Sequence, residues 1–206
     1  MQKRIDLQDG GTLFYDDAFY DRLQADAVFQ AIKAETPWRQ ESGRFGPFPR
    51  LTMWYADAGL TYTYSGVTHE AIEWTSTLAQ IRREVEAVSE TTFNSLLLNF
   101  YRDGLDSMGY HADDERELGK NPVIASVSFG AERRFHLKHK KSGEKMTFDL
   151  AHGSLLVMGG TCQHHWIHCV PKIKATVGER INLTFRKILS PSPPAPLPRW
   201  GDGKNG

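Results

Sequence analysis

Two segments near the start of the chain carry apolar residues at helical spacing. The first contains Leu23, Ala27, Val28, Ala31 and Ile32. This helix should end before Pro37, because proline has no amide hydrogen to donate to the preceding turn. The second contains Trp74, Leu78, Ile81, Val85 and Val88, spaced four, three, four and three residues apart. Its apolar stripe lies opposite polar residues, which predicts a helix packed against a core.

From residue 95 onwards the pattern changes to short extended segments separated by turn residues. The predicted strands cover residues 95–101, 123–129, 134–138, 146–150, 154–158, 164–168 and 180–188. Side chains alternate between the two faces of a strand, so the last segment has a polar and an apolar face. Its polar face contains Arg180, Asn182, Thr184 and Arg186. Short strands with turns between them indicate a sandwich or a barrel.

Composition restricts the class of protein. With 206 residues, 40% of them hydrophobic, the chain is long enough for one domain with a substantial core. It contains 25 basic and 25 acidic residues, so net charge gives no general attraction to a polyanion. No long apolar run or secretion signal is apparent, and we expect a soluble intracellular protein, cytoplasmic if bacterial. In that compartment Cys162 and Cys169 should be buried free thiols.

The segment His111-Ala112-Asp113 is a candidate metal-binding motif. On a strand, residues i and i+2 point the same way, so both side chains would reach the same point. Two imidazoles and one carboxylate hold non-haem Fe(II) and leave positions open for a co-substrate and O₂. An isolated His-x-Asp is more often an ordinary surface or core pair, so the motif needs support from elsewhere.

The second histidine of such a set must come from another segment. In an extended segment 164–168, His164 and His168 share one face and His165 lies on the other. Alternation therefore excludes only His165. His152 stays possible on spacing alone.

The polar face of segment 180–188 supports an oxygenase. The guanidinium groups of Arg180 and Arg186 can pair with carboxylates through two parallel hydrogen bonds, a geometry that lysine cannot reproduce. Such a face suits a dicarboxylate. A metal triad followed by a strand with two arginines is the pattern of a 2-oxoglutarate-dependent oxygenase.

Five blocks of sequence form a combined pattern: Asn99-Phe100-Tyr101-Arg102-Asp103-Gly104, residues 111–118, residues 124–131, residues 151–156, and residues 180–188. Together they resemble the AlkB family of nucleic-acid dealkylases, and most of all the branch of AlkB homologue two, which repairs duplex DNA. The resemblance covers roughly residues 20–189. It implies a fold that is mainly β with N-terminal helices, built on a double-stranded β-helix, or jelly-roll, core. It also implies one catalytic domain over residues 1–189.

The resemblance implies roles for individual residues. The family's second iron histidine is followed by a turn with proline, as in His168-Cys169-Val170-Pro171, so His168 would join His111 and Asp113 as the ligands of Fe(II). The residues that would bind 2-oxoglutarate are Arg180, Tyr101 and Asn182 at its free carboxylate, Arg186 and Asn99 near the metal, and Thr184 on the same face. With O₂, such an enzyme converts 2-oxoglutarate to succinate and CO₂ while a methyl group leaves the base as formaldehyde.

Residues 38–68 resemble the family's nucleotide-recognition region. Tyr64 would stack on a flipped base, and Tyr62 would form a hydrogen bond with the nucleotide. Glu115 would lie near an exocyclic amine, which adenine and cytosine have and thymine lacks, and Arg50 would also contact the substrate. Without the resemblance, an aromatic strand packed in a core is the simpler interpretation of the two tyrosines.

Three basic segments have two interpretations. They are Arg133-Arg134, residues 138–141 and Lys172-Ile173-Lys174. Each alone could be an ordinary solvated surface. Beside an oxygenase site they are better interpreted as phosphate contacts that position a strand without reading its sequence.

One loop departs from the duplex-repairing branch. Where that branch has an apolar wedge that enters the base stack, this chain has Glu41-Ser42-Gly43. Phe45 and Phe48 lie nearby and are the alternative wedge if the loop is shifted. Unstacking a paired base costs a few kcal/mol, which a wedge helps to offset. We therefore expect a preference for single-stranded methylated DNA, or RNA.

Two other function classes stay open at this point. A 2-oxoglutarate-dependent hydroxylase or demethylase of a protein or small molecule would keep the iron and co-substrate residues without an aromatic base clamp. A non-enzymatic jelly-roll that binds nucleic acid would lose the metal residues. We further expect a monomer with no membrane association, and a Pro-rich disordered tail at residues 190–206.

Overall fold

The structure is a computed structural model that describes residues 1–43, 46–64 and 67–189, with only the backbone described for residues 62–64 and 67–69. The expected tail at 190–206 and Phe45 therefore lie outside the described residues. The helices are α1 (Arg22–Glu35), α2 (Ser76–Ser89) and the short α3 (Cys162–His165), with two 3-10 turns, η1 (Gln8–Gly10) and η2 (Arg116–Leu118). In the described part of the chain, no helix combines the length and apolar character needed to cross a membrane.

Both predicted N-terminal helices are confirmed. Helix α1 begins with a capping box, in which the Asp21 carboxylate accepts a hydrogen bond from the amide of Gln24 and the Gln24 side chain accepts one from the amide of Asp21. It ends at Glu35, before Pro37. Two members of the predicted apolar stripe, Leu23 and Ala27, are exposed, Leu23 to 82%. The helix packs through Ile32, which was predicted, and through Ala25, which was not.

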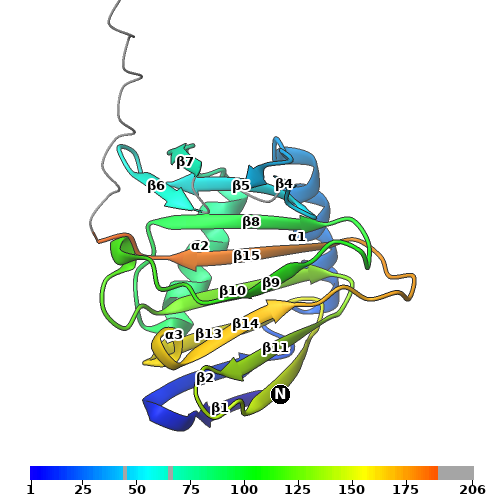
Figure 1. The fold of residues 1–206 in the computed structure, drawn as a ribbon. Helices are drawn as coiled ribbons and strands as arrows, with labels where there is room; N and C mark the ends of the chain where they lie inside the picture. The colour runs from blue at the N-terminus through cyan, green and yellow to red at the C-terminus, as the bar shows by residue number, and fades with distance from the viewer. Residues whose placement is uncertain (44–45, 65–66, 190–206) are drawn as a thin grey trace, which may run out of the picture.

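Most strands lie in two antiparallel sheets (Figure 1). The larger sheet has seven strands in the order β1 (Gln2–Asp6), β2 (Gly11–Asp16), β13 (Ser154–Gly160), β10 (Ile124–Gly130), β15 (Arg180–Arg186), β8 (Ser95–Tyr101) and β5 (Leu51–Ala56). The smaller sheet has four, in the order β12 (Lys145–Leu150), β11 (Arg133–His139), β14 (Trp166–Val170) and β9 (Met108–His111). Two short hairpins, β3 (Ser42–Gly43) with β4 (Gly46–Pro47) and β6 (Thr61–Tyr64) with β7 (Val67–Glu70), complete the described strands.

The larger sheet separates two apolar clusters. On one side its strands pack against α1 and α2, which lie behind the sheet in Figure 1, and this cluster includes Leu78 of α2 and Leu183 of β15. On the other side the two sheets face each other, and Met158 of β13 lies in the same cluster as Leu137 and Trp166 of the smaller sheet. Two packed antiparallel sheets confirm the expected jelly-roll, and the functional side chains lie between them.

The structure corrects three sequence-based expectations. Residues 164 and 165 lie in α3 instead of an extended strand, so the alternation argument applied to 164–168 was wrong. Strand β9 ends at His111, so His111 and Asp113 do not share a strand. Strands β1 to β5 and β7 were not predicted, and β9 was expected only as an extended segment at His111. Cys162 and Cys169, as expected, are buried free thiols.

Candidate active site

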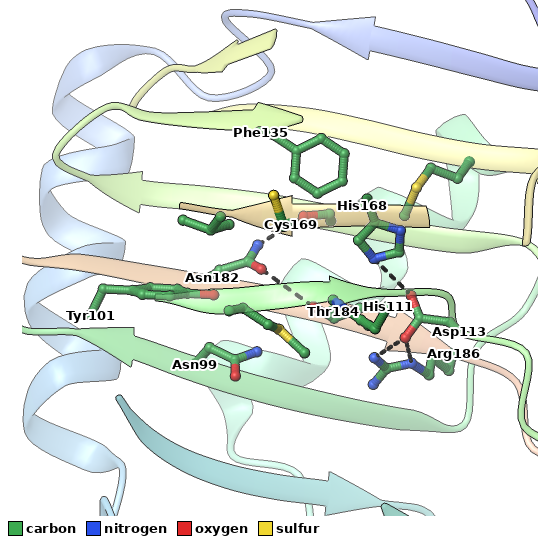
Figure 2. A pocket seen from close by; sticks show the side chains of 14 residues that line it. Asn99, Tyr101, His111, Asp113, Phe135, His168, Cys169, Asn182, Thr184 and Arg186 are labelled. Carbon is green, nitrogen blue, oxygen red and sulfur yellow. Dashed lines mark hydrogen bonds and ion pairs between the residues drawn. The ribbon is translucent and has the colours of Figure 1, made fainter. Parts of the chain in front are cut away.

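Three side chains converge between the two sheets (Figure 2). His111 ends β9 and is paired in register with His168 of β14, and Asp113 follows two residues after β9. Their potential ligand atoms all lie within 4.8 Å of one another, and the two imidazole rings are 4.2 Å apart at their centroids. The sheet register therefore places the histidines, while the loop after β9 turns the carboxylate towards them.

Asp113 is fixed by neighbours on three sides. Arg186 donates hydrogen bonds to its Oδ1 from Nε, at 3.0 Å, and from Nη2. Its Oδ2 accepts no hydrogen bond from any described residue and lies 3.5 Å from His168 Nε2. Its amide donates to Gln163 Oε1 at 2.9 Å. Burial by itself would raise the pKa of Asp113, but the Arg186 charge and the two histidines outweigh it and hold this pKa well below its usual range. Asp113 is therefore a carboxylate with one oxygen available.

Both histidines are neutral at pH 7. Burial, assisted by the neighbouring His111, lowers the pKa of His168 to about 3. Burial also lowers the pKa of His111. The Nδ1 atom of His111 lies 2.9 Å from the carbonyl oxygen of Gly109, which can only accept, so Nδ1 carries the proton. The Nε2 lone pair of His111 is left for a ligand bond, as in metal sites where the second ring nitrogen donates to a carbonyl.

A polar strand face continues from this cluster. In the pairing of β15 with β8, Arg180 lies opposite Tyr101 and Asn182 lies opposite Asn99. The alternation predicted for both strands is therefore confirmed. Asn182 donates from Nδ2 to Ser126 Oγ at 2.8 Å and to the carbonyl oxygen of Val127 at 2.9 Å. The pocket lining includes Asn99, Tyr101, Asn182, Thr184 and Arg186 together with His111, Asp113 and His168.

Arg180 lies fully buried at the far end of this face. Its Nη2 donates to Ser128 Oγ at 2.9 Å, and its guanidinium carbon is 5.1 Å from the centre of the Tyr101 ring. Within the part of the chain that the structure describes, its Nε and Nη1 have no hydrogen-bond partner. Burial lowers the pKa of Arg180 to about 10, so the group remains cationic at pH 7. A buried cation with two unsatisfied N–H groups fits a carboxylate that would approach beside Tyr101.

Of the four expected substrate residues, the structure describes the side chains of Glu115 and Arg50. The side chains of Tyr62 and Tyr64 lie outside the described residues, and their backbone forms β6. Glu115 is half-buried and precedes the first residue of η2, two positions after Asp113. Arg50 is 4% exposed and donates from Nε to Asn99 Oδ1 at 2.7 Å, so it contacts the polar strand face.

Several residues that line the pocket or support its side chains were missed from the sequence: Ser126 and Phe135 line it, while Ser128 contacts Arg180 and Gln163 contacts Asp113. Ser126 and Ser128 alternate on β10, and the alternation rule applied to that strand would have found them. Phe135 stacks on His168 with ring centroids 5.1 Å apart, and Gln163 supports Asp113 from α3. Nothing in the local sequence signals either contact, because both depend on how the smaller sheet packs.

Two of the three basic segments were partly misinterpreted, because Arg133 and His139 are buried. Arg133 is 2% exposed and cannot contact a phosphate from the surface. Its guanidinium donates to the carbonyl oxygens of Asp103, Asp106 and Pro171 and lies 5.6 Å from the centre of the Tyr101 ring. Arg134, Lys172 and Lys174 are exposed, as a phosphate-contacting surface requires.

Comparison with known proteins identifies the family. Residues 11–186 match the 2OG-Fe(II) oxygenase superfamily. The human DNA oxidative demethylase ALKBH2 is 43% identical over 185 residues, which cover 82% of this chain and 71% of that protein. This chain belongs to the AlkB family. The rat alpha-ketoglutarate-dependent dioxygenase alkB homolog 3 is 42% identical over 199 residues, covering 90% of this chain and 65% of that protein.

The AlkB fold extends to more distant members. The structure of OsALKBH1 superposes with a TM-score of 0.66 at 18% identity, covering 90% of this chain and all of that one. As an AlkB-family protein, this chain is an Fe(II)- and 2-oxoglutarate-dependent dioxygenase. Its residues fit both groups, since neutral histidines and an Asp113 oxygen without a hydrogen bond suit Fe(II), and Arg180 suits the acid end of 2-oxoglutarate.

Proposed function

We propose that this chain is a DNA oxidative demethylase that removes methyl groups from ring nitrogens such as those of 1-methyladenine and 3-methylcytosine. The observation that carries the proposal is the convergence of His111, Asp113 and His168 beside a polar strand face that ends in the unsatisfied guanidinium of Arg180. Relatives such as human ALKBH2 are named DNA oxidative demethylases, which supports the substrate class.

The iron end depends on three side chains and their supports. Bound Fe(II), together with 2-oxoglutarate and O₂, supplies the oxidising power for the methyl carbon. His111 and His168 would offer neutral imidazole nitrogens, and Asp113 would offer Oδ2 because Arg186 already occupies Oδ1. Phe135 covers one face of the His168 ring and limits the access of water from that side.

The co-substrate end depends on charge and depth. Arg180 would pair with the free carboxylate of 2-oxoglutarate through Nε and Nη1, with Tyr101 beside it and Asn182 on the same face. Arg186 and Asn99 would serve the end near the metal, and Thr184 would line the path between the two ends. Because Arg180 sits on β15, an interior strand of the larger sheet, its distance from the iron ligands is fixed by the sheet.

Substrate recognition would use the β6–β7 hairpin. Tyr64 would stack on the flipped base, Tyr62 would hydrogen-bond to the nucleotide, and Glu115 and Arg50 would contact it near the metal. The support comes from the base of the hairpin, where Asp57 Oδ1 accepts from Trp74 Nε1 at 2.9 Å and from Arg82 Nη1 at 2.6 Å. Asp57 precedes β6 and Trp74 follows β7, so these contacts join the two ends of the hairpin and link them to Arg82 of α2. The two tyrosines would therefore extend from a fixed base.

The decisive experiment is turnover on defined oligonucleotides. The chain is incubated with Fe(II), 2-oxoglutarate and oligonucleotides bearing 1-methyladenine or 3-methylcytosine, followed by mass analysis. Loss of the methyl group, dependent on 2-oxoglutarate and absent in Asp113→Ala, is the expected result. Conversion of 2-oxoglutarate without any demethylation of DNA or RNA would instead favour a hydroxylase of proteins or small molecules.

A separate experiment tests the stacking role of Tyr64. Tyr64→Ala should reduce use of the methylated base much more than it reduces 2-oxoglutarate turnover without substrate, because base stacking contributes about 1–3 kcal/mol. Equal losses in the two assays would indicate a folding defect and remove Tyr64 from the substrate site.

The preference for single strands rests on the β3–β4 hairpin. Ser42 is exposed there, and Phe48 packs inward: the Arg50 guanidinium lies 5.0 Å from the centre of its ring, and the ring covers Gly43 so closely that a Cβ there would meet it at 2.7 Å. Because its ring packs against Gly43 and Arg50, Phe48 would not serve as the apolar wedge. Ser42→Phe should raise the duplex-to-single-strand rate ratio relative to a Ser42→Ala control. Faster repair of duplex than of single strands by the unmodified chain would overturn the preference and implicate Phe45.

The same proposal includes a monomeric enzyme in which residues 1–189 form one catalytic domain, working inside the cell where its nucleic-acid substrate is found. Size-exclusion chromatography with light scattering tests the oligomeric state. A dimer at assay concentrations would contradict it.

A further inference from the structure

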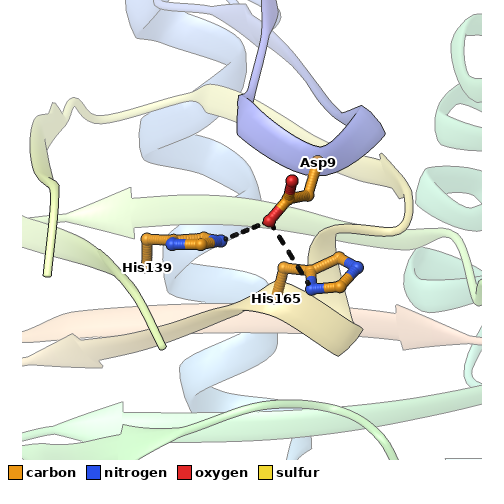
Figure 3. A group of neighbouring side chains, drawn as sticks. All are labelled: Asp9, His139 and His165. Carbon is orange, nitrogen blue, oxygen red and sulfur yellow. Dashed lines mark hydrogen bonds and ion pairs between the residues drawn. The ribbon is translucent and has the colours of Figure 1, made fainter. Parts of the chain in front are cut away.

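A second cluster of two histidines and one aspartate lies outside the iron site. Asp9 comes from η1, His139 from the end of β11, and His165 from α3, and the Asp9 carboxylate points between the two rings (Figure 3). Asp9 Oδ2 lies 3.1 Å from His139 Nε2 and 3.9 Å from His165 Nδ1. The iron and co-substrate chemistry uses none of these three residues.

The spacing suits a transition metal with few ligands. The three potential ligand atoms lie within 4.8 Å of one another. In a tetrahedral site with ligand bonds of about 2.0–2.2 Å, neighbouring ligand atoms are separated by roughly 3.3–3.6 Å. Small side-chain rotations would bring this cluster to that geometry. His139 is 1% exposed, whereas His165 and Asp9 are 33% and 43% exposed, so a metal could enter and keep a water ligand.

The backbone holds the three segments together independently of any metal. Thr161, just before α3, donates from Oγ1 to the carbonyl oxygen of Asp9. The amide of Lys140 donates to the carbonyl oxygen of His165 at 2.7 Å, and Trp166 Nε1 donates to the carbonyl oxygen of Gln8 at 3.2 Å. Because these contacts fix η1, β11 and α3 relative to one another, little conformational entropy remains to be lost when a metal binds.

Both ring nitrogens of His139 have hydrogen-bond partners, which determine where its proton lies. The amide of Ser142 donates to His139 Nδ1 at 3.0 Å, so without a metal the proton sits on Nε2 and is donated to Asp9. Ser142 Oγ also lies 2.8 Å from Nδ1 and can accept, because its own hydrogen can go to Gln8 Oε1 at 3.1 Å. For Nε2 to bind a metal, the ring proton must move to Nδ1, which would then donate to Ser142 Oγ, and the Ser142 amide must give up its hydrogen bond to Nδ1.

We propose that Asp9, His139 and His165 form a Zn²⁺ site with three protein ligands and one water. Two nitrogens and one carboxylate oxygen suit zinc, and such donor sets bind it more tightly than Fe(II). The site would tie the N-terminal η1 turn to the smaller sheet. It would also fix α3, whose Gln163 accepts the hydrogen bond from the amide of Asp113 in the iron site.

Zinc stoichiometry tests the proposal. Because the iron cluster also binds divalent metals, the titration uses His111→Ala as the background, with Zn²⁺ measured by competition against a coloured chelator. This variant should bind one Zn²⁺ per chain, and the unmodified chain two. Adding His165→Ala or Asp9→Asn should weaken the remaining site at least about 100-fold, and Ser142→Ala should weaken it about 10–100-fold through the lost second-sphere contact.

A matched control comes from the same short helix. His164 is exposed and contacts Asn121 Oδ1 at 2.8 Å, so His164→Ala in the same background should leave zinc affinity within about twofold. Absence of zinc binding by the His111→Ala variant would overturn the proposal and leave a hydrogen-bonded Asp–His pair. Equal losses from His164→Ala and His165→Ala would overturn the assignment of the ligand. Substitution of Co²⁺ reports separately on coordination, because four-coordinate cobalt with these donors absorbs visible light strongly and the six-coordinate aqueous ion does not.

Discussion

Two clusters in this chain contain the same side chains, two histidines and one aspartate, in very different surroundings. In the first, the side chain of Asp113 is 1% exposed, and Arg186 occupies one of its oxygens. In the second, the side chain of Asp9 is 43% exposed, and one oxygen faces both His139 and His165. The first cluster opens onto a polar strand face with a buried cation, and the second lies among an N-terminal turn, a strand end and a short helix.

The comparison shows that the ligand set alone does not define the chemistry. A two-histidine, one-carboxylate set becomes an oxygenase centre where positions for a co-substrate lie beside it, and Arg180 provides that in the first cluster. The second cluster has a backbone framework around it and supports a structural metal. Fixing the carboxylate through an arginine also keeps Asp113 charged inside the protein.

The largest effect is expected from removing a ligand of the first cluster, compared with removing the nearby His164. His111→Ala, Asp113→Ala and His168→Ala should each abolish demethylation, because two remaining ligands cannot hold Fe(II) in a reactive geometry. His164→Ala should keep most activity, since His164 is exposed and its ring contacts Asn121. The readout is formaldehyde release per enzyme. Activity in His168→Ala together with loss in His164→Ala would show that the ligand assignment is wrong.

A smaller loss is expected when the hydrogen bonds to Asp113 are reduced but the positive charge beside it is kept. Arg186→Lys replaces the two hydrogen bonds to Oδ1 by one at most, so metal affinity should fall about 10–100-fold, as for other second-sphere changes. Titration with Mn²⁺ under anaerobic conditions measures it without turnover. Arg134→Lys, on the exposed face of β11, is the matched control and should leave affinity unchanged. Equal affinities in Arg186→Lys and the unmodified chain would remove Arg186 from the support of the metal site.

The sequence predicted the central strands well because their alternation survives folding. Strand β8 occupies the predicted range 95–101, and the pairing of β15 with β8 brings the polar residues of both strands to one face. Both long helices were found because three- and four-residue spacing is specific to helices. The N-terminal strands β1 and β2 were missed, since each has a mixed pattern of polar and apolar residues that becomes a strand only through pairing, β2 beside β13 and β1 beside β2.

The remaining errors have a common physical cause. Asp113 and His165 were interpreted by strand alternation, but both lie just outside strands, where the chain turns and alternation no longer applies. Arg133 was interpreted as a surface charge. Sequence alone does not show that three backbone carbonyl oxygens accept hydrogen bonds from its guanidinium in the interior. Site residues on strands are therefore predictable, while those supplied by loops and by packing between sheets are not.

The co-substrate end should respond to a change of shape at constant charge. Arg180→Lys keeps a cation but loses the forked geometry, and one hydrogen bond to a charged group contributes about 1.5 kcal/mol or more. The 2-oxoglutarate concentration for half-maximal turnover should therefore rise at least about tenfold, with little change in metal affinity. Parallel titrations of 2-oxoglutarate and Mn²⁺ separate the two effects. An unchanged 2-oxoglutarate requirement would exclude Arg180 from this role.

The smallest expected effect concerns a third carboxylate, Asp106, which shares its partner type with Asp113 but lies in the loop between β8 and β9. Arg102 donates to it from Nε at 2.7 Å, Nη2 at 2.9 Å and the backbone amide at 2.9 Å. Burial alone would raise the pKa of Asp106, but the hydrogen bonds from Arg102 outweigh it and lower this pKa below its usual range.

A lowered pKa in the folded state means that Asp106 stabilises the protein above the usual pKa of an aspartate, and that this contribution is lost as the pH falls through the folded-state value. Asp106→Asn should therefore lower the free energy of unfolding by about 1 kcal/mol at pH 7, a value reduced by the 42% exposure of the Arg102 side chain, and the difference should shrink as the pH drops below about 4. Urea unfolding at several pH values measures it. In Asp103→Asn, the amide oxygen can still accept from the amides of Leu105 and Asp106, so this control should show a small difference at every pH. A loss in Asp106→Asn that grows towards acid pH would show that Arg102 does not stabilise the carboxylate.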